Sequence, residues 1–453
     1  MEIKDCLKHA DETKELILKK KALEEIPNLT ETFFDRNSVY CIISDENTYK
    51  AAGIKVKKIL EQSNKIVLGS HVFHGEPVLH ADYDHVNFIK NWISALPEYK
   101  NIVPIAVGAG TINDLVKRAS FELALPYFCI PTAASVDGYT PNGAALLING
   151  FKQTVPCTAP KVVAADIDII AKAPAYLTSS GFGDLASKII AGTDWIIAEK
   201  AGSAGALVAP AVDQVCWAMC QKDLVPALNA AVDAVKGNTE AISILFQKLA
   251  ITGFAMQYYK NSRPVSGAEH LFSHTWEMDD LTFDGVPVTH GHKVTIGTLA
   301  ATAFTEIFFA NPNSPPAVKN EYQRPTKAER ESEVKESFKN SRGCEMVVKT
   351  ALEKFMEKKT INAVNELFHD SYREIRTEVL EWLLPYKKLR ELLDQAGCPL
   401  KGEAIGLNRT NVIATTRRAQ MIRNKYSILD LAWDMGNFEE ILSKIESSNF
   451  YLR

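Results

Sequence analysis

The chain has 453 residues, which at roughly 150 residues per domain allows two or three domains. Its hydrophobic content of 46% and charged content of 23% are typical of a globular protein, and a net charge of −4 argues against nucleic acid as a partner. The first 25 residues are too charged for a signal peptide, and no apolar run is long enough for a membrane helix. We therefore expect a cytoplasmic protein without membrane insertion.

Short β-rich runs alternate with helical stretches in the first part of the chain. The predicted strands are Ser38–Ser44, Lys65–Leu68, Ile102–Val107 and Tyr127–Ile130, and the predicted helices between them are Thr48–Gln62, Tyr83–Ile93 and Ile112–Arg118. This alternation predicts a mostly parallel, doubly wound sheet. We therefore expect an α/β, Rossmann-like domain over residues 1–172.

A glycine turn follows the third predicted strand. Gly108 and Gly110 would let backbone N–H groups approach a pyrophosphate, at a helix N-terminus that favours an anion. The alternative is a strand-to-helix turn without a ligand, because Asn113 stands where a dinucleotide fingerprint would have its third glycine. Asp45, after the first predicted strand, would either accept hydrogen bonds from an adenosine ribose, favouring NAD over NADP, or cap the next helix.

The chain from residue 173 onward has mainly helical periodicity. The predicted helical stretches are Leu185–Lys200, Ala211–Lys222, Leu224–Val235, Glu240–Tyr259, Lys293–Phe309 and Glu345–Gln395. We expect a helical domain over residues 173–453. A charged insertion near residues 311–345 is interpreted as a solvated loop and surface helix, with an oligomer contact as the alternative.

Asp184, His270 and His290 offer one carboxylate and two imidazoles. This ligand set suits a divalent ion such as Zn²⁺ and leaves a coordination position for a substrate oxygen. Spacing alone does not establish the site, because the aspartate is distant in sequence from both histidines. His292 is not expected to be a ligand, and Cys216 and Cys220, one helical turn apart, are interpreted as core residues.

Several separate segments carry a resemblance to a known family. They are the glycine turn, Thr132-Ala133-Ala134-Ser135-Val136-Asp137-Gly138-Tyr139, Gly150-Phe151-Lys152, Gly181-Phe182-Gly183-Asp184, Glu269-His270, His290-Gly291 and Arg423-Asn424-Lys425-Tyr426. From about Ser38 to Tyr426 the chain resembles the sn-glycerol-1-phosphate dehydrogenase family, within the superfamily of iron-type alcohol dehydrogenases, glycerol dehydrogenase and dehydroquinate synthase. The resemblance implies a dehydroquinate synthase-like fold.

The resemblance also implies an activity, namely reversible, metal-dependent reduction of dihydroxyacetone phosphate to sn-glycerol 1-phosphate with NAD(H) or NADP(H). It assigns Asp184, His270 and His290 as ligands of one divalent metal and His274 as a catalytic neighbour. The ligand set favours Zn²⁺ and also accepts Ni²⁺ or Fe²⁺. The expected cofactor-binding residues are Asp45, Gly108, Gly110, Thr111, Asp114, Thr132 and Ser135, and the expected substrate-binding residues are Asp137 and Lys152. A homo-oligomer, with a dimer favoured, is expected as well.

Two other functions remain open at this stage. A glycerol or other polyol dehydrogenase would use the same metal and hydride chemistry, and a dehydroquinate synthase-like lyase would use bound NAD only transiently. Net consumption of NADH separates a dehydrogenase from the lyase.

Overall fold

The computed structural model describes residues 1–201, 211–316, 324–448 and 450, and its contacts divide the chain into two units. Unit 1 comprises Met1–Ile148, Lys152–Leu185 and Lys222–Asn261, whereas unit 2 comprises Asn149–Phe151, Ala186–Gln221 and Ser262–Arg453. The sequence predicted a domain boundary near residue 173, where the periodicity changes, whereas the contacts place Lys222–Asn261 in unit 1 as well. The reason is that helix α12 (Thr239–Tyr259) packs against elements that precede residue 173.

Unit 1 is built on a six-stranded sheet in the order β1-β8-β5-β4-β2-β3, and every pairing is parallel. The strands are β1 (Glu15–Lys19), β2 (Val39–Asp45), β3 (Val67–Phe73), β4 (Ile102–Gly108), β5 (Phe128–Pro131) and β8 (Val162–Asp166). The predicted runs correspond to β2, β3, β4 and β5, and the two strands missed by the sequence reading are β1 and β8. The doubly wound α/β class is confirmed.

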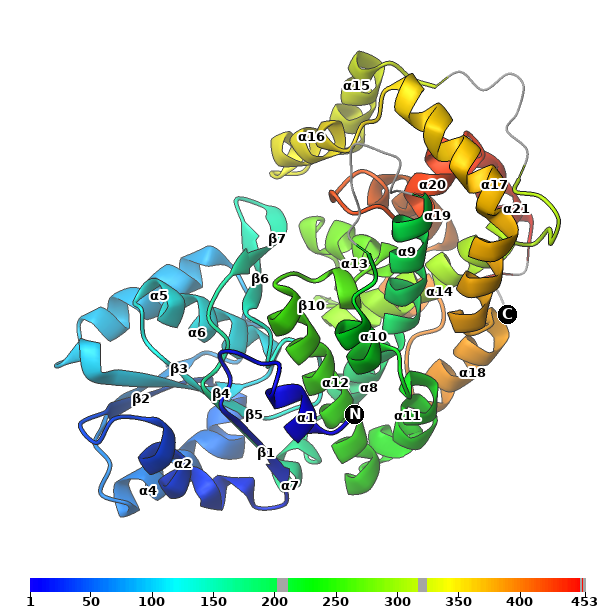
Figure 1. The fold of residues 1–453 in the computed structure, drawn as a ribbon. Helices are drawn as coiled ribbons and strands as arrows, with labels where there is room; N and C mark the ends of the chain where they lie inside the picture. Colours follow the sequence, from blue (N-terminus) through cyan, green and yellow to red (C-terminus); the bar gives the residue numbers. More distant parts are fainter. Residues whose placement is uncertain (202–210, 317–323, 449, 451–453) are drawn as a thin grey trace. The chain divides into compact units, whose positions relative to one another are not determined.

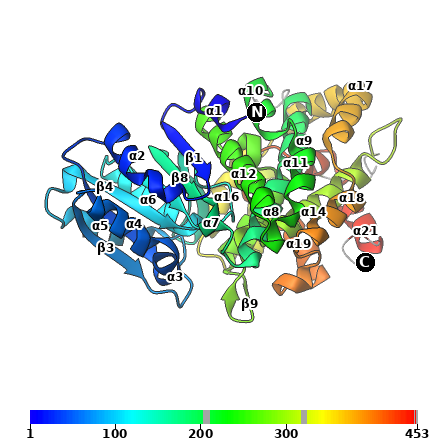
Figure 2. The ribbon, with the colours of Figure 1, turned by 90° about the horizontal axis from the view of Figure 1, so that it is seen from below.

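Helices cover both faces of this sheet (Figures 1 and 2). Helices α2 (Ile26–Phe33) and α4 (Ile54–Gln62) pack on one face, where their apolar residues join those of β2, β4, β5 and β8 in one buried core. Helices α5 (Tyr83–Ser94) and α6 (Gly110–Glu122) lie on the other face. The stretch predicted as one helix from Thr48 is interrupted, because α3 (Glu46–Thr48) and a π-helical turn precede α4.

A β-hairpin leaves the sheet after β5. Its strands are β6 (Gly143–Ile148) and β7 (Phe151–Pro156), and the two residues between them, Asn149 and Gly150, have φ of 51° and 76°. Positive φ at both positions is typical of the tight Asn-Gly turn, whose twist matches that of the strands. Lys152 therefore lies on a strand, directly after the turn and Phe151.

The remaining helices of unit 1 are α1 (Ile3–Leu7), α7 (Ile167–Ile170), α8 (Ala175–Ala186), which ends where unit 2 begins, α11 (Leu224–Ala231) and α12. Helix α12 contacts α1, α7 and β1. Gln257 near its end donates to the carbonyl oxygen of Thr140 at 2.9 Å and to Oγ1 of Thr13 at 3.0 Å. These contacts tie α12 to the sheet rather than to the later helices.

Unit 2 is mainly helical, as predicted for the C-terminal part. Its helices are α9 (Lys188–Ala201), α10 (Gln214–Cys220), α13 (Ala268–Met278), α14 (His290–Phe308), α15 (Lys327–Ser337), α16 (Cys344–Glu353), α17 (Lys358–Trp382), α18 (Tyr386–Gln395), α19 (Arg409–Ala419), α20 (Ile428–Asp434) and α21 (Phe438–Ser447). Two short strands, β9 (Thr282–Phe283) and β10 (Val286–Pro287), join α13 to α14. Helix α9 is buried along residues 188–198 and contacts α13, α14, α17 and α20.

The segment predicted as a charged insertion forms a surface helix where it is described. Helix α15 begins with a capping box between Thr326 and Glu329 and buries only Arg330 and Val334. Residues 317–323 of this segment lie outside the described residues. Across the described part of the chain, no helix is long and apolar enough to span a bilayer.

Candidate metal and cofactor site

Asp184 lies on α8 and is completely buried. The approach of α8 to the Thr132–Ser135 segment requires a glycine, because a Cβ at Gly181 would meet the carbonyl oxygen of Ala134 at 1.8 Å. One turn later, the Asp184 carboxylate accepts a hydrogen bond from the backbone N–H of Asp137 at 2.8 Å. The predicted ligand and the predicted substrate-binding residue are therefore neighbours in unit 1.

His270 and His290 come from helices α13 and α14, which pack closely. A Cβ at Gly297 on α14 would meet the backbone oxygen of Glu269 at 2.3 Å, so glycine is needed for this approach. The imidazole rings of His270 and His290 are 5.4 Å apart between centroids. Thr289 caps the start of α14 by accepting from the N–H of His292, which fixes His290 in the first turn.

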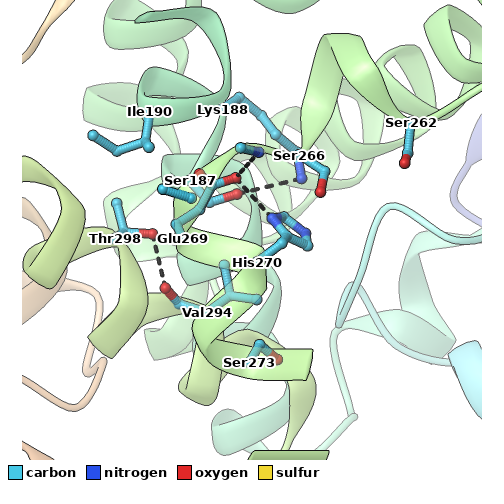
Figure 3. Close-up of polar contacts among 12 residues, drawn as sticks. Ser187, Lys188, Ile190, Ser262, Ser266, Glu269, His270, Ser273, Val294 and Thr298 are labelled. Carbon is cyan, nitrogen blue, oxygen red and sulfur yellow. Dashed lines mark hydrogen bonds and ion pairs between the residues drawn. The ribbon is translucent and has the colours of Figure 1, made fainter. Parts of the chain in front are cut away.

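A carboxylate holds each histidine ring. Nδ1 of His270 is 2.8 Å from Oε1 of Glu269 (Figure 3), and Nδ1 of His290 is 2.7 Å from Oε1 of Glu277. Metal-binding histidines usually donate their second ring N–H to a carboxylate, which fixes the ring and raises its basicity. This arrangement turns Nε2 of both rings into the nitrogens suited to binding an ion.

Asp184, His270 and His290 each offer one ligand atom, and these atoms lie within 4.8 Å of one another. They form the one such group of three found among the described residues, so the predicted ligand set fits a divalent ion in composition and spacing. His292 is outside this group, and burial lowers its pKa to about 4. Cys216 and Cys220 are buried on α10 and are also outside it.

His274 lies one turn after His270, with its ring centroid 6.0 Å from that of His270 and 6.3 Å from that of His290. Its Nδ1 lies 3.4 Å from Nη2 of Arg423. Burial, reinforced by the positive charge of Arg423, holds the pKa of His274 well below its usual range. A neutral imidazole next to the two predicted ligands suits the predicted role as a catalytic neighbour.

The glycine turn joins β4 to α6 in unit 1. The N-cap residue of α6 is Ala109, which makes no side-chain cap, and Thr111 lies in the first turn of the helix. A Cβ at Gly110 would meet Cγ1 of Val136 at 2.6 Å, which gives this glycine a packing role whether or not it binds a cofactor. Thr132 N–H donates to the carbonyl oxygen of Gly108 at 3.1 Å, so the predicted Thr132–Ser135 segment and the turn are adjacent.

Three other predicted residues have partners within the protein. Asp45 caps α3 and accepts from the N–H groups of Asn47 and Thr48, which is the helix-cap alternative. The carboxylate of Asp114 accepts from Nζ of Lys117 at 3.0 Å and from the N–H of Ala145 at 3.2 Å. Lys152 donates from Nζ to the carbonyl oxygen of Ala145 at 3.0 Å.

Sequence reasoning missed the residues that support the histidines. Glu269 and Glu277 were not singled out, although Glu269 adjoins His270 and Glu277 lies two helical turns after it on α13. It also assigned no role to Arg423 and Lys425, which were noted only as part of a family-like closing segment. The packing that gives these residues their partners is visible only in the fold.

Comparisons with known proteins identify the relatives of this chain. Residues 17–174 match a family described as iron-containing alcohol dehydrogenase. The chain is 33% identical over 257 residues to a glycerol-1-phosphate dehydrogenase (NAD(P)+) from Bacillus velezensis, a match that covers 56% of this chain and 62% of that protein. It is 32% identical over 286 residues to the Pyrococcus horikoshii protein of the same name, covering 63% of this chain and 77% of that one.

The chain belongs to the glycerol-1-phosphate dehydrogenase family. The match spans less than two thirds of the length of the Bacillus velezensis relative. The fold is shared more widely, because a probable glycerol dehydrogenase from Sinorhizobium meliloti aligns with a TM-score of 0.60 at 12% identity, covering 97% of this chain and 99% of that one. Membership of the family confirms the resemblance inferred from the sequence segments.

Proposed function

We propose that the protein reduces dihydroxyacetone phosphate to sn-glycerol 1-phosphate, reversibly, with NADH or NADPH and one divalent metal. The observation that carries this proposal is the group Asp184, His270 and His290, with both imidazoles oriented by carboxylates, in a chain of the glycerol-1-phosphate dehydrogenase family. Relatives named for the phosphorylated substrate favour it over a plain polyol dehydrogenase or a lyase.

Three groups of residues would bind the metal, the dinucleotide and the substrate. Asp184, His270 and His290 would hold the metal, with Zn²⁺ favoured and Ni²⁺ or Fe²⁺ as alternatives. The turn at Gly108–Thr111 with Thr132 and Ser135 would hold the dinucleotide, and we retain Asp45 and Asp114 as weaker candidates because other contacts already occupy them. Asp137, whose N–H orients Asp184, would contact the substrate hydroxyls.

When bound, the nicotinamide supplies the hydride and the metal acts as a Lewis acid at the carbonyl oxygen. The chain itself must hold the ketone in one orientation and provide a proton for the new hydroxyl. His274 would relay that proton, and its buried position near both predicted histidine ligands supports this role. Each reduction consumes one NAD(P)H and one proton and yields the alcohol and NAD(P)+.

The test measures NADH and NADPH oxidation with dihydroxyacetone phosphate and dihydroxyacetone side by side, after metal removal and reloading with Zn²⁺, Ni²⁺ or Fe²⁺. We expect the phosphorylated ketone to be reduced far more efficiently, because binding energy from a remote phosphate can orient the reacting carbonyl. The product should be inert to a dehydrogenase specific for sn-glycerol 3-phosphate. Equal efficiencies would indicate a polyol dehydrogenase, and no net NADH consumption would indicate a lyase.

A further inference from the structure

Three basic residues gather in unit 2 around the helix that carries His270. Lys188 begins α9 and is completely buried, and Arg423 and Lys425 lie between α19 and α20. We call these three residues the basic cluster. Arg423 and Lys425 keep some exposed residue surface, although their charged ends are enclosed strongly enough for burial to lower the pKa of both.

The hydrogen bonds of Lys425 and Arg423 go to neutral atoms. Nζ of Lys425 donates to Oγ of Ser262 at 2.8 Å and to the carbonyl oxygen of Ser266 at 3.2 Å. The Arg423 guanidinium lies 3.4 Å from Nδ1 of His274 and over the ring of Phe151, 5.7 Å from its centroid. Buried cations are normally paired with carboxylates, whereas Lys425 donates to a hydroxyl and a carbonyl oxygen. The carboxylate whose charge acts on Arg423 is Glu277, which already holds the imidazole of His290 at 2.7 Å.

The charges around Lys425 are mostly positive as well. After burial, the groups that lower the pKa of Lys425 are Arg263, Arg423 and Lys188, and Glu269 is the carboxylate that opposes them. Glu269 already accepts hydrogen bonds from Nδ1 of His270 and from the N–H of Gly267, both at 2.8 Å. The enclosed positive charge therefore costs stability in the isolated protein, and a bound anion would remove that cost.

We propose that the basic cluster, with the hydroxyl of Ser262, binds the phosphate group of the substrate. This inference rests on the proposed function. A phosphate monoester carries about −1.5 to −2 charge at pH 7 and offers three acceptor oxygens, which matches guanidinium, ammonium and hydroxyl donors. This inference does not use Lys152, which was expected from the sequence to bind the substrate.

The position of the basic cluster suits a small substrate. Ser266, which binds Lys425, lies on the loop that leads into α13, and Glu269 and His270 follow in its first turn (Figure 3). Arg423 reaches His274 on the next turn of the same helix. A triose phosphate has only a few bonds between its phosphorus and its ketone, so a phosphate held here lies next to the groups proposed to act on the carbonyl.

The test compares wild type with Lys425→Met in thermal unfolding, with and without inorganic phosphate, and in ketone reduction. Without phosphate, the variant should melt higher than wild type, because one of several like charges has been removed. Phosphate should raise the melting temperature of wild type and leave the variant unchanged. The ratio of kcat/KM for dihydroxyacetone phosphate over dihydroxyacetone should fall about tenfold or more, because the variant lacks one charge-assisted hydrogen bond to the phosphate.

Lys354→Met is the matched control, because Lys354 is a buried lysine that donates to the carboxylate of Asp430 at 2.8 Å. It should melt lower than wild type and should keep its stabilisation by phosphate. If Lys425→Met does not fold, Arg423→Gln takes its place, with the same expected loss of stabilisation by phosphate.

The outcomes separate this inference from the proposed function. The phosphate site alone is overturned if the wild-type protein reduces dihydroxyacetone phosphate and Lys425→Met changes neither the stabilisation by phosphate nor the ratio of kcat/KM for the two ketones. A second outcome is that phosphate stabilises wild type but not the variant, while wild type does not reduce dihydroxyacetone phosphate. That outcome supports the anion site and overturns the proposed substrate. A variant that melts lower and keeps its phosphate response shows that Lys425 is structural.

Discussion

Unit 2 contains two sets of enclosed charges that differ in how they are balanced. In one set, Lys354 donates to Asp430 at 2.8 Å and Arg324 donates to Asp434 at 2.9 Å. We call these four residues the paired cluster. In the basic cluster, by contrast, Lys425 and Arg423 donate to hydroxyl, carbonyl and imidazole groups.

The difference separates stability from function. A buried ion pair is costly to break because the partner left behind keeps its charge without compensation. The paired cluster therefore acts as part of the folded framework of α16 and α20. In the basic cluster, Lys425 and Arg423 donate to uncharged groups near the predicted histidine ligands, and in our proposal a bound phosphate compensates their charge. Substitutions in the two regions should consequently affect different measurements.

The largest expected effect lies at the metal site, where function should be lost and the fold retained. His270→Ala should lower kcat/KM by about 10³-fold or more, because Lewis-acid stabilisation is worth several kcal/mol. Metal content, measured by mass spectrometry, should fall in parallel, while the melting temperature of the metal-free protein should change little. His369→Ala, at an exposed position on α17, is the control and should keep full metal content. Full occupancy in His270→Ala would remove that residue from the ligand set.

The paired cluster should show the reverse pattern. Lys354→Met leaves Asp430 charged in the interior, so the free energy of unfolding should fall by about 3–5 kcal/mol in urea titrations. The remaining folded protein should bind metal normally. Lys335→Met, which removes an exposed ion pair with Glu331 on α15, should leave stability unchanged. A stable Lys354→Met protein would show that the two clusters are not energetically different.

A pH titration sharpens the same comparison. Burial raises the pKa of Asp434 to about 6 from the ordinary value of 3.8, against the opposing effect of Arg324. As pH rises from about 4 to about 6, the folded state keeps the proton on Asp434 while the unfolded state loses it. The stabilisation that comes from the protonated Asp434 carboxyl is therefore complete below about pH 4 and is lost by about pH 6. Asp434→Asn should lack this decline, which amounts to about 3 kcal/mol. Parallel stability profiles from pH 4 to 7 for the two proteins would contradict the assignment.

The elements of this fold that could be predicted from the sequence are those whose neighbouring residues show a clear hydrophobic or glycine pattern. The apolar run Ile102–Val107 and the glycines after it predicted β4 and its turn into α6. Strand β1 (Glu15–Lys19) was missed because a lysine follows its three apolar residues and a glutamate precedes them, and its pairing with β8 supplies the burial.

The candidate site divides in the same way. Asp184, His270 and His290 stood out because each lies in a segment with a family resemblance. The hydrogen bond from Lys425 to Ser262 joins residues that are 163 positions apart, and a local sequence pattern cannot predict a contact of that kind. Lys152 stays a prediction from the same resemblance, and the fold adds that its Nζ donates to the carbonyl oxygen of Ala145.

The smallest expected effect comes from Glu269, which belongs to both the metal site and the surroundings of the basic cluster. Its Oε1 accepts from Nδ1 of His270, and it is the carboxylate that favours the charged form of Lys425. Glu269→Gln keeps an oxygen for the imidazole and removes the negative charge. Metal affinity should therefore fall about 10–100-fold, as expected when a partner of a ligating histidine is weakened.

Phosphate binding should respond to Glu269→Gln in the opposite direction. With the carboxylate gone, Lys425 loses the negative charge that favours its charged form, so inorganic phosphate should stabilise the metal-free variant more than metal-free wild type. Metal titration and thermal unfolding on one preparation measure both effects. Glu269→Asp, which keeps the charge and shortens the side chain, is the matched comparison, and its phosphate response should stay at the wild-type level. A variant in which metal affinity and phosphate stabilisation fall together would mean that Glu269 serves packing alone, because only its charge connects the two sites with opposite sign.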